Sequence, residues 1–415
     1  MIARAFYTVA LYALLPFVAA RLWWRGRREP GYRRRIGERF GHYRFAAERA
    51  VVWVHAVSVG EARASTPLVH ALQEALPDHE LLLTCTTATG RDTLKQMYGE
   101  SVSIAWLPYD YPGSVRRFVE HFRPRLGVLM ETEIWPNLLA ACRAFDVPVV
   151  LASARMSERS ARGYRTWNAV TRPAFASLAG ACAQSEADAD RLVALGAKTV
   201  SVCGNLKFDI APDAAQAEAG RAWRASLGRP VLLLASTREG EEKLLLDALA
   251  SSPADALVIV VPRHPQRFDA VAALLGDGAR RRGRGEEPRS GDRFFLGDSM
   301  GEMAFYCSAA DVAIIGGSFV PLGGQNLIEA CATGTPVIFG ASMYNFSEAS
   351  SLALAAGAAQ QVQDATEAIR VASALLADRG RREAMGAAGK RLCEQHRGAV
   401  QKHLAVCRTL LDRRP

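Results

Sequence analysis

The sequence of 415 residues lacks the patterns that hold disulfide-rich or zinc-dependent proteins together. Its eight cysteines are scattered and form no Cys-x-x-Cys pair, and its eight histidines include no His-Glu-x-x-His pattern. These absences exclude a disulfide framework and a familiar class of zinc site. We therefore expect buried thiols in a reducing compartment and no protein-bound metal.

Internal repeats and low-complexity tracts are also missing, and 49% of the residues are apolar. A repeat solenoid and a disordered chain are therefore both disfavoured. The length exceeds the usual size of a single hydrophobic core, so we expect two domains.

Positive charge is scarce outside one short segment. Residues 21–44 hold nine arginines and two glutamates, a net charge of +7, which leaves only +2 of the total of +9 for the rest of the chain. No pattern of stacking aromatic residues accompanies this charge. A nucleic-acid partner is therefore not expected.

Residues 2–24 are apolar except for Arg4 and Arg21, with Pro16 in the middle and tyrosine or tryptophan towards both ends. The segment is close to the roughly 20 residues that cross a bilayer, and the arginines behind it indicate the cytoplasmic side. No small-residue cleavage site follows, which disfavours a signal peptide. We expect residues 1–24 to form a membrane anchor, either spanning or interfacial. A core helix of the first domain is the alternative.

From residue 51 onward, short apolar runs alternate with amphipathic helical patterns. This alternation predicts parallel sheets covered on both faces by helices. The pattern breaks near residues 209–217 and then restarts. We therefore predict an α/β protein with two doubly wound, Rossmann-like domains facing across a cleft, residues 25–210 and residues 211–415, the second with a helical tail. Residues 280–292 are charged and glycine-rich and are predicted to form an exposed loop.

The stretch from Gly316 to Glu329 follows an apolar run and is rich in glycine. We predict a strand, a tight turn and a helix that begins near Gly324. The first turn of such a helix suits a phosphate, and Glu329 could accept the hydroxyls of a ribose. An ordinary strand–turn–helix unit is the alternative.

In the first half, polar residues follow predicted strands, where ligands bind in such sheets. Glu61 lies in the first turn of a helix and could be a general base, or could only compensate the helix dipole. Glu131 and Glu133 stand at a strand end, and either could be the acid or base. Lys207 could neutralise charge on a leaving phosphate, or could pair with Asp209.

In the second half, Arg263, His264 and Arg267 follow a strand and could bind phosphate. Further along, Ser299 and Glu302 have the spacing of a capping box at the start of a helix, and this structural role is sufficient for them.

Taken together and in order, these stretches resemble the family of 3-deoxy-D-manno-octulosonic acid (Kdo) transferases of lipopolysaccharide synthesis. The resemblance covers nearly the whole chain. It is carried by the apolar start with its arginines, Ser58-Val-Gly-Glu61, Met130-Glu-Thr-Glu-Ile-Trp-Pro136, Ser153-Ala-Arg155, Leu206-Lys-Phe-Asp209, Pro262-Arg-His-Pro265, Met300-Gly-Glu302, Gly316-Gly-Ser-Phe319 and Asn326-Leu-Ile-Glu329.

The resemblance implies a GT-B fold and an inverting, metal-independent transfer of Kdo from CMP-Kdo to a lipid A precursor, with release of CMP and no cofactor. It implies the cytoplasmic face of the inner membrane as the location. Glu61 would be the general base, and Glu131 and Lys207 would stabilise the transition state. The residues implied to hold CMP are Pro262, Arg263, Met300, Gly301, Glu302, Asn326, Leu327, Ile328 and Glu329.

Two other classes of function stay open from the residues alone. A nucleotide-sugar epimerase could use the same two-domain scaffold, but it would not need an apolar N-terminus. A non-enzymatic, membrane-associated binding module would not explain Glu131 and Glu133 at a strand end.

Overall fold

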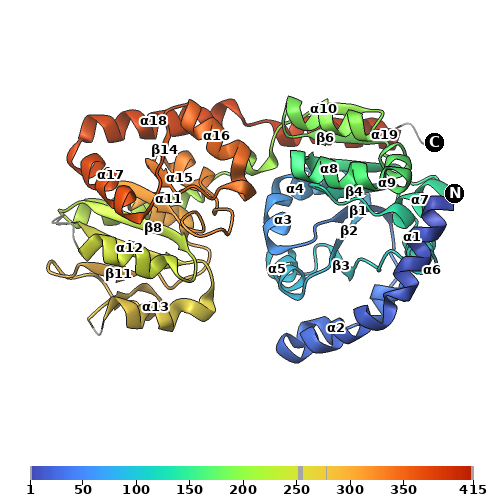
Figure 1. The fold of residues 1–415 in the computed structure, drawn as a ribbon, viewed down its shortest axis with the longest axis horizontal. Helices are drawn as coiled ribbons and strands as arrows, with labels where there is room; N and C mark the ends of the chain where they lie inside the picture. Colours follow the sequence, from blue (N-terminus) through green and yellow to red (C-terminus); the bar gives the residue numbers. More distant parts are fainter. Residues whose placement is uncertain (1, 251–255, 277, 413–415) are drawn as a thin grey trace. The chain divides into compact units, whose positions relative to one another are not determined.

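The computed structural model describes residues 2–250, 256–276 and 278–412. The described chain divides into two compact units. One contains the residues up to 210 and those from 397 onward, and the other contains residues 211–396. Each unit is a parallel sheet with helices on both faces (Figure 1).

The first unit is built on a seven-stranded parallel sheet with the order β3-β2-β1-β4-β5-β6-β7. Its strands are β1 (Ala50–His55), β2 (His79–Cys85), β3 (Ser103–Trp106), β4 (Leu126–Met130), β5 (Val149–Ala154), β6 (Gly180–Ala183) and β7 (Val200–Val202). Every residue of β4 and β5 is buried, because helices cover both faces of a parallel sheet. This burial explains why the strands appear in the sequence as continuous apolar runs.

Helices pack around these strands. They are α1 (Ile2–Ala13), α2 (Leu15–Arg28), α3 (Val59–Ala64), α4 (Thr66–Ala75), α5 (Ala88–Tyr98), α6 (Pro112–Phe122), α7 (Pro136–Ala144), α8 (Glu158–Thr166), α9 (Asn168–Phe175), α10 (Glu186–Leu195) and α19 (Ala399–Asp412), with short 3-10 turns η1 (Pro30–Arg33), η2 (Ile36–Phe40) and η3 (Leu206–Asp209). Helix α7 begins at Pro136, whose fixed φ suits the first position of a helix.

The second unit repeats the plan with the strand order β10-β11-β9-β8-β12-β13-β14. Its strands are β8 (Val231–Thr237), β9 (Leu257–Pro262), β10 (Arg280–Arg281), β11 (Phe294–Leu296), β12 (Val312–Ile315), β13 (Val337–Phe339) and β14 (Ala359–Gln361). The two edge strands β10 and β14 were not predicted, since neither is apolar. The prediction of an exposed loop over residues 280–292 is therefore wrong at its start, where β10 pairs with β11.

The helices of the second unit are α11 (Ala214–Ser226), α12 (Glu241–Ala250), α13 (Phe268–Leu275), α14 (Met303–Ser308), α15 (Ile328–Thr333), α16 (Ser347–Ala355), α17 (Ala365–Ala377) and α18 (Arg379–Gln395), with 3-10 turns η4 (Pro265–Arg267), η5 (Arg282–Arg284) and η6 (Tyr344–Phe346).

The strand order reverses at β1 in the first unit and at β8 in the second. Strand β1 lies between β2 and β4, and β8 lies between β9 and β12. In open parallel sheets, the crevice beyond the carboxyl end of the strand where the order reverses is the usual binding site. The segments after β1 and β8 therefore lie at the usual position of a ligand site in each sheet.

The last helix, α19, belongs to the first unit, and the prediction that residues 397–415 are part of the second domain is wrong for its described residues. Helix α19 packs against α4, β4 and β6, and Figure 1 shows it in red beside green β6. Its N-terminus is fixed by Asp209, whose carboxylate accepts the backbone N–H groups of Gly398 at 2.6 Å and Val400 at 2.7 Å.

The apolar N-terminal segment forms two helices, α1 and α2, that are bent by 48° at the break between them. Among the described residues no single helix is long and apolar enough to span a membrane, whereas this bent pair meets the requirement in length and composition. Helix α1 is tied to the first unit by polar contacts. The Tyr7 hydroxyl donates to Asp110 at 2.9 Å, and Thr8 bonds to Asn137.

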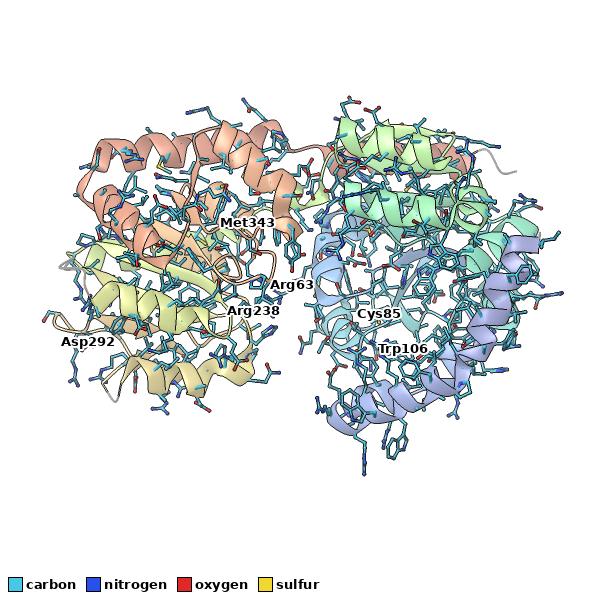
Figure 2. The ribbon with its side chains drawn as sticks, viewed as in Figure 1. Arg63, Cys85, Trp106, Arg238, Asp292 and Met343 are labelled. Atoms are coloured by element: carbon cyan, nitrogen blue, oxygen red, sulfur yellow. The ribbon has the colours of Figure 1, made fainter. Side chains whose placement is uncertain are left out.

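Part of the basic segment that follows is built into the first unit. Arg39 is only 2% exposed, and its guanidinium lies 3.8 Å from the ring centroid of Trp106, which Figure 2 shows among the side chains of this unit. The neighbouring Glu38 is also buried and pairs with Arg91 at 2.8 Å. At least one arginine of the cluster is therefore a packing residue.

Candidate active site

Glu61 lies in the first turn of α3, the helix that follows β1, the strand at which the order reverses. Its carboxylate folds back and accepts the backbone N–H of Val57 at 2.7 Å, which fixes it at the carboxyl edge of the sheet. The pKa of Glu61 is raised to about 8, chiefly by burial and also by the nearby charges of Glu131 and Glu133, against the lowering effects of the Val57 bond and Lys207. A carboxylate with this proton affinity is a stronger base than an exposed one.

Glu131 follows β4, the strand next to β1, and forms an ion pair with Lys207 at 3.1 Å. The backbone of Glu131 is left-handed, with φ of 56°, which few residues other than glycine adopt. The Lys207 N–H donates to the Asn205 side chain at 3.1 Å. Lys207 thus pairs with Glu131, whereas the Asp209 carboxylate caps α19.

Glu133 is the second carboxyl of this strand end. It accepts the indole N–H of Trp135 at 2.8 Å, and burial raises its pKa. The first unit therefore gathers three carboxyl groups and one ammonium group around the end of β1. Within the described part of the chain, Glu61 is the member whose carboxylate is held by a backbone N–H and not by another side chain, which leaves it suited to proton transfer.

The glycine-rich stretch of the second unit does not form the helix that the sequence predicted near Gly324. Helix α15 begins only at Ile328, because Gly323 and Gly324 have φ of 83° and 74°. The Asn326 side chain accepts the Ile328 N–H at 3.0 Å and donates to Glu329 at 2.9 Å. The loop therefore continues to Asn326, and Glu329 is in the first turn of α15.

Other residues that were expected to hold CMP differ in their exposure to solvent. The side chains of Leu327 and Ile328 are buried, with exposed fractions of 1% and 3%. Neither residue therefore presents appreciable surface, from side chain or backbone. Met300, in contrast, is 49% exposed, and Gly301 has φ of 81°.

The expected capping box of Ser299 and Glu302 is wrong. Glu302 instead forms a bidentate ion pair with Arg282, at 2.7 and 2.8 Å. The Ser299 hydroxyl is hydrogen-bonded to the Tyr306 hydroxyl. The side chain of Arg282 also stacks 3.8 Å from the Phe305 ring centroid. These contacts fix the segment from Met300 to Glu302 against η5.

Pro262 is the last residue of β9, and Arg263 follows it at the edge of the sheet. The Arg263 N–H donates to the Thr237 carbonyl at 3.0 Å, and its guanidinium donates to the Gln325 side chain at 3.1 Å. The end of β9 is thereby joined to the glycine-rich loop. Burial lowers the pKa of His264, and the positive charges of Arg238 and Arg263 lower it further. The second unit thus has a cationic edge beside its loop.

Glu241, in the first turn of α12, was missed in the sequence. It is fully buried, with an exposed fraction of 0%, and accepts three backbone N–H groups, from Gly317 at 2.5 Å, Phe319 at 2.8 Å and Arg238 at 3.0 Å. Burial raises its pKa, against the lowering effect of these bonds. The signal in the sequence was an acidic residue in the first turn of a helix. The sequence does not show that this residue would bond to backbone groups 76 and 78 positions away.

The glycine at the start of the loop permits a close approach of two strand ends. A Cβ atom at Gly316 would lie 2.5 Å from the Ser236 carbonyl oxygen and 2.6 Å from the Thr237 Cα. The ends of β8 and β12 therefore meet here with no room for a side chain.

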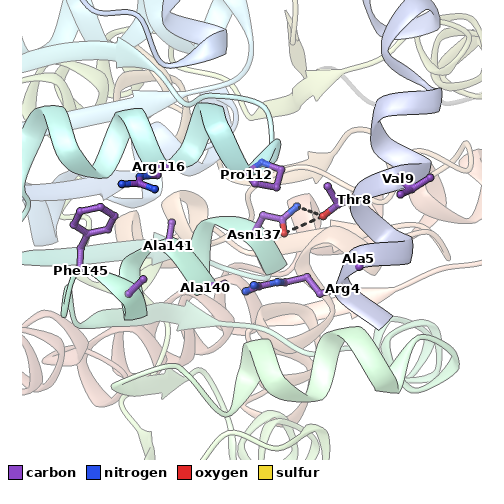
Figure 3. A pocket seen from close by; sticks show the side chains of 11 residues that line it. Arg4, Ala5, Thr8, Val9, Pro112, Arg116, Asn137, Ala140, Ala141 and Phe145 are labelled. Carbon is purple, nitrogen blue, oxygen red and sulfur yellow. Dashed lines mark hydrogen bonds between the residues drawn. The ribbon is translucent and has the colours of Figure 1, made fainter. Parts of the chain in front are cut away.

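A separate groove of about 640 Å³ lies in the first unit, between α1 and the helices α6 and α7. Figure 3 shows Thr8 and Asn137 hydrogen-bonded at its wall, with Arg4 and Arg116 among the lining residues. The rest of the lining includes alanines of α7 and Phe145. The groove is therefore apolar with basic residues at its margin.

Across the described ranges, no group of three or more histidine, cysteine, aspartate or glutamate side chains is arranged to hold a metal ion. The eight cysteines are all free and buried.

Comparison with known proteins defines the class first. The chain aligns with Anabaena HepE in complex with UDP with a TM-score of 0.59, covering 87% of this chain and 99% of that one at 14% identity. A similar match, with a TM-score of 0.56 and 13% identity, is to Acinetobacter baumannii MurG, over 87% of this chain and 99% of that one. The two parallel α/β units are those of the GT-B fold, as predicted.

The sequence then defines the family. The model of the 3-deoxy-D-manno-octulosonic-acid transferase family matches residues 34–210. The Bordetella pertussis 3-deoxy-D-manno-octulosonic acid transferase is 46% identical over 97% of this chain and 98% of its own, and the Haemophilus influenzae enzyme is 34% identical over 99% of both. The chain belongs to this family, which confirms the resemblance. Nothing favours the epimerase alternative.

Proposed function

We propose that the chain transfers Kdo from CMP-Kdo to a hydroxyl group of a lipid A precursor and releases CMP, with inversion at the sugar carbon. The names of the relatives support the transfer of Kdo. The observation that carries the chemistry is Glu61, a partly buried carboxylate with its pKa raised to about 8, next to the ion pair of Glu131 and Lys207.

In this proposal, Glu61 removes the proton from the acceptor hydroxyl, because a neutral sugar hydroxyl is a weak nucleophile. The resulting oxygen forms a bond to the anomeric carbon of Kdo. The bond from that carbon to the phosphate oxygen breaks, and CMP departs with the electron pair. One displacement of this kind inverts the configuration.

Glu131 and Lys207 stabilise the transition state in this scheme. The Lys207 ammonium offsets developing negative charge, and Glu131 holds it in place at 3.1 Å. Fixed charges of this kind act without reorganisation during the reaction. No step requires a metal ion or another cofactor.

The second unit holds the CMP part of the donor. Arg263 is a donor to the phosphate or the sugar carboxylate, and the loop up to Asn326 lies beside it through the Gln325 contact. Glu329 accepts the ribose hydroxyls. Pro262 and the segment from Met300 to Glu302 complete the nucleotide site, and the buried Leu327 and Ile328 support the start of α15 behind it.

In this proposal the protein acts at the cytoplasmic face of the inner membrane, where its lipid acceptor is found, and its N-terminal helices attach it to that surface. Several large apolar side chains of α1, α2 and the break between them are exposed: Ile2, Phe6, Val9, Tyr12, Leu14, Phe17, Trp23 and Trp24. Arg27 and Arg28 lie 4.5 Å from the ring centroids of Trp23 and Trp24. This combination of exposed apolar surface and arginine suits an anionic lipid surface.

The function is tested by incubating the full chain with CMP-Kdo and a tetra-acylated lipid A precursor, with products read by mass. We expect an increase of one Kdo residue or more on the lipid and one CMP per Kdo. Hydrolysis of CMP-Kdo without a lipid product would contradict the proposal.

The location is tested by flotation with vesicles that contain anionic phospholipid. The Phe6→Ser, Phe17→Ser double variant is expected to float much less than the wild type. Its control is Trp167→Ser, which removes an exposed tryptophan from outside these helices. Equal flotation of the double variant and the wild type would exclude this surface.

A further inference from the structure

The end of β5 contains an irregularity next to the proposed catalytic residues. The pairing of β5 with β6 shifts register between Leu151 and Ala154, which is the mark of a β-bulge. Ser153, within the bulge, has a left-handed backbone with φ of 49° and is only 2% exposed. A buried N–H group in such a bulge needs another acceptor.

That acceptor is His403 of the C-terminal helix α19. Its Nε2 accepts the Ser153 N–H at 2.8 Å, across 250 positions of the chain. Its Nδ1 lies 2.7 Å from the Ala399 carbonyl oxygen. Because a carbonyl can only accept, Nδ1 carries the proton and the imidazole is neutral. His403 is fully buried, and burial lowers its pKa, which favours this neutral form.

Hydrogen bonds continue from Ser153 to the proposed catalytic lysine. The Gln184 amide donates to the Ser153 carbonyl at 2.9 Å and to its hydroxyl at 3.0 Å. The Gln184 oxygen accepts from Asn205 at 3.2 Å, and the Asn205 oxygen accepts the Lys207 N–H at 3.1 Å. Gln184 and Asn205 are themselves buried.

The bulge is also joined to the other member of the ion pair. The Glu131 N–H donates to the carbonyl of Ala152, the residue before Ser153, at 2.9 Å. Both strained residues, Glu131 and Ser153, thus lie at the same corner of the sheet. A shift of the bulge would move the backbone of Glu131 on one side and that of Lys207 on the other.

We propose that His403 is a positioning residue for transfer: by accepting the Ser153 N–H, it holds the β5 bulge and, through Gln184 and Asn205, the backbones that carry Glu131 and Lys207. This inference rests on the proposed function, since it assigns a geometric task to that catalytic pair. It gives the C-terminal helix a role in the chemistry of the first unit.

Two substitutions in the full chain distinguish the effect of losing the hydrogen-bond acceptor from the effect of changing the side-chain volume. His403→Gln keeps an acceptor near the position of Nε2, whereas His403→Leu removes it at similar volume. We expect kcat of the leucine variant to fall about tenfold or more, with KM for CMP-Kdo within about twofold of the wild type. The glutamine variant should retain kcat within about threefold.

Hydrogen exchange gives a second readout that does not depend on catalysis. The amide of Ser153 should exchange faster in His403→Leu than in the wild type and should stay protected in His403→Gln. Leu404→Ala is the matched control, because it removes a buried side chain from the same helix without touching Ser153. It should lower Tm as much as His403→Leu while leaving kcat nearly unchanged well below Tm.

The proposal is overturned if His403→Leu keeps the wild-type kcat, if Leu404→Ala lowers kcat equally, if Ser153 exchange does not change, or if glutamine restores protection but not kcat. Failure of the proposed function gives a different result, because the wild type itself would then form no Kdo-lipid product.

Discussion

Each unit carries a glutamate in the first turn of the helix that follows the strand at which the sheet order reverses. The two glutamates differ in their burial and in their hydrogen-bond partners. Glu61 follows β1, is partly buried and accepts one backbone N–H, from Val57. Glu241 follows β8, is fully buried and accepts three, from Gly317, Phe319 and Arg238. Burial raises the pKa of both carboxyl groups.

The difference lies in what each carboxylate can still do. The oxygens of Glu241 are occupied by backbone groups of a loop, so this residue is a clamp for the glycine-rich segment. The carboxylate of Glu61 has spare acceptor capacity and nearby charges that change its proton affinity. The same position in a repeated fold therefore provides a structural residue in one unit and a proposed base in the other.

The largest effect is expected for Glu61→Gln. Loss of a general base costs about 10²–10⁴-fold, so we expect kcat to fall about 10³-fold. The variant keeps an acceptor for the Val57 N–H and should fold normally. The measurement is CMP release with the lipid acceptor present.

Glu133→Gln is the matched control, since Glu133 has a buried carboxyl with a raised pKa but is held by Trp135. It should lose less than about tenfold. Equal losses for the two variants would remove the distinction between Glu61 and its neighbours.

Glu241→Ala should act on stability instead of chemistry. It leaves three buried N–H groups without their acceptor, and we expect the free energy of unfolding to fall by about 3 kcal/mol. Denaturant unfolding measures this change. Glu239→Ala, an exposed neighbour in the same turn, should change it by less than about 0.5 kcal/mol. A stable Glu241→Ala protein would contradict the clamp.

Arg263→Lys tests the cationic edge of the second unit. Lysine keeps the charge but loses the planar fork, so the Kd for CMP should rise about tenfold while kcat at saturating donor changes little. Calorimetry with CMP measures the Kd. Arg284→Lys, at the exposed end of η5, should leave the Kd unchanged, and a similar loss in that variant would argue against a specific site.

A further effect is on the pH dependence of stability. Because the folded pKa of Glu61, about 8, lies above the ordinary value of 4.5, its protonated form favours the folded state. This stabilisation is fully present below about pH 4.5 and is lost as the pH rises through about 8. In Glu61→Gln the loss should be absent, so the variant should be more stable than the wild type at pH 8.5. A wild type with identical unfolding free energies at pH 6 and pH 8.5 would contradict this.

The buried strands were predictable because their apolar runs record burial on both faces, as in β4 and β8. Strands β10 and β14 could not be predicted, because a short polar strand at the edge of a sheet has no apolar run in the sequence. The start of α15 was misplaced because the glycines and Asn326 set the backbone locally, while the helical spacing of the sequence continued.

Candidate site residues stand out in the sequence where a polar side chain interrupts an apolar pattern, as Glu61, Glu131 and Arg263 do, and their roles are predictions. Glu241 and His403 could not be found this way. Each acts on a backbone group far along the chain, and an amphipathic helix such as α19 does not reveal which of two cores it will join. Long-range hydrogen bonds to backbone atoms leave no periodic signal in the sequence.

The central claim, that Glu61 is the base, is tested most directly by the pH dependence of transfer in a single turnover. The rate of Kdo-lipid formation by the wild type should rise about tenfold per pH unit below about pH 8 and level off above it, because only the ionised carboxylate accepts a proton. The residual rate of Glu61→Gln should lack this rise. A flat wild-type profile from pH 6 to 9, or the same rise in both proteins, would contradict the account.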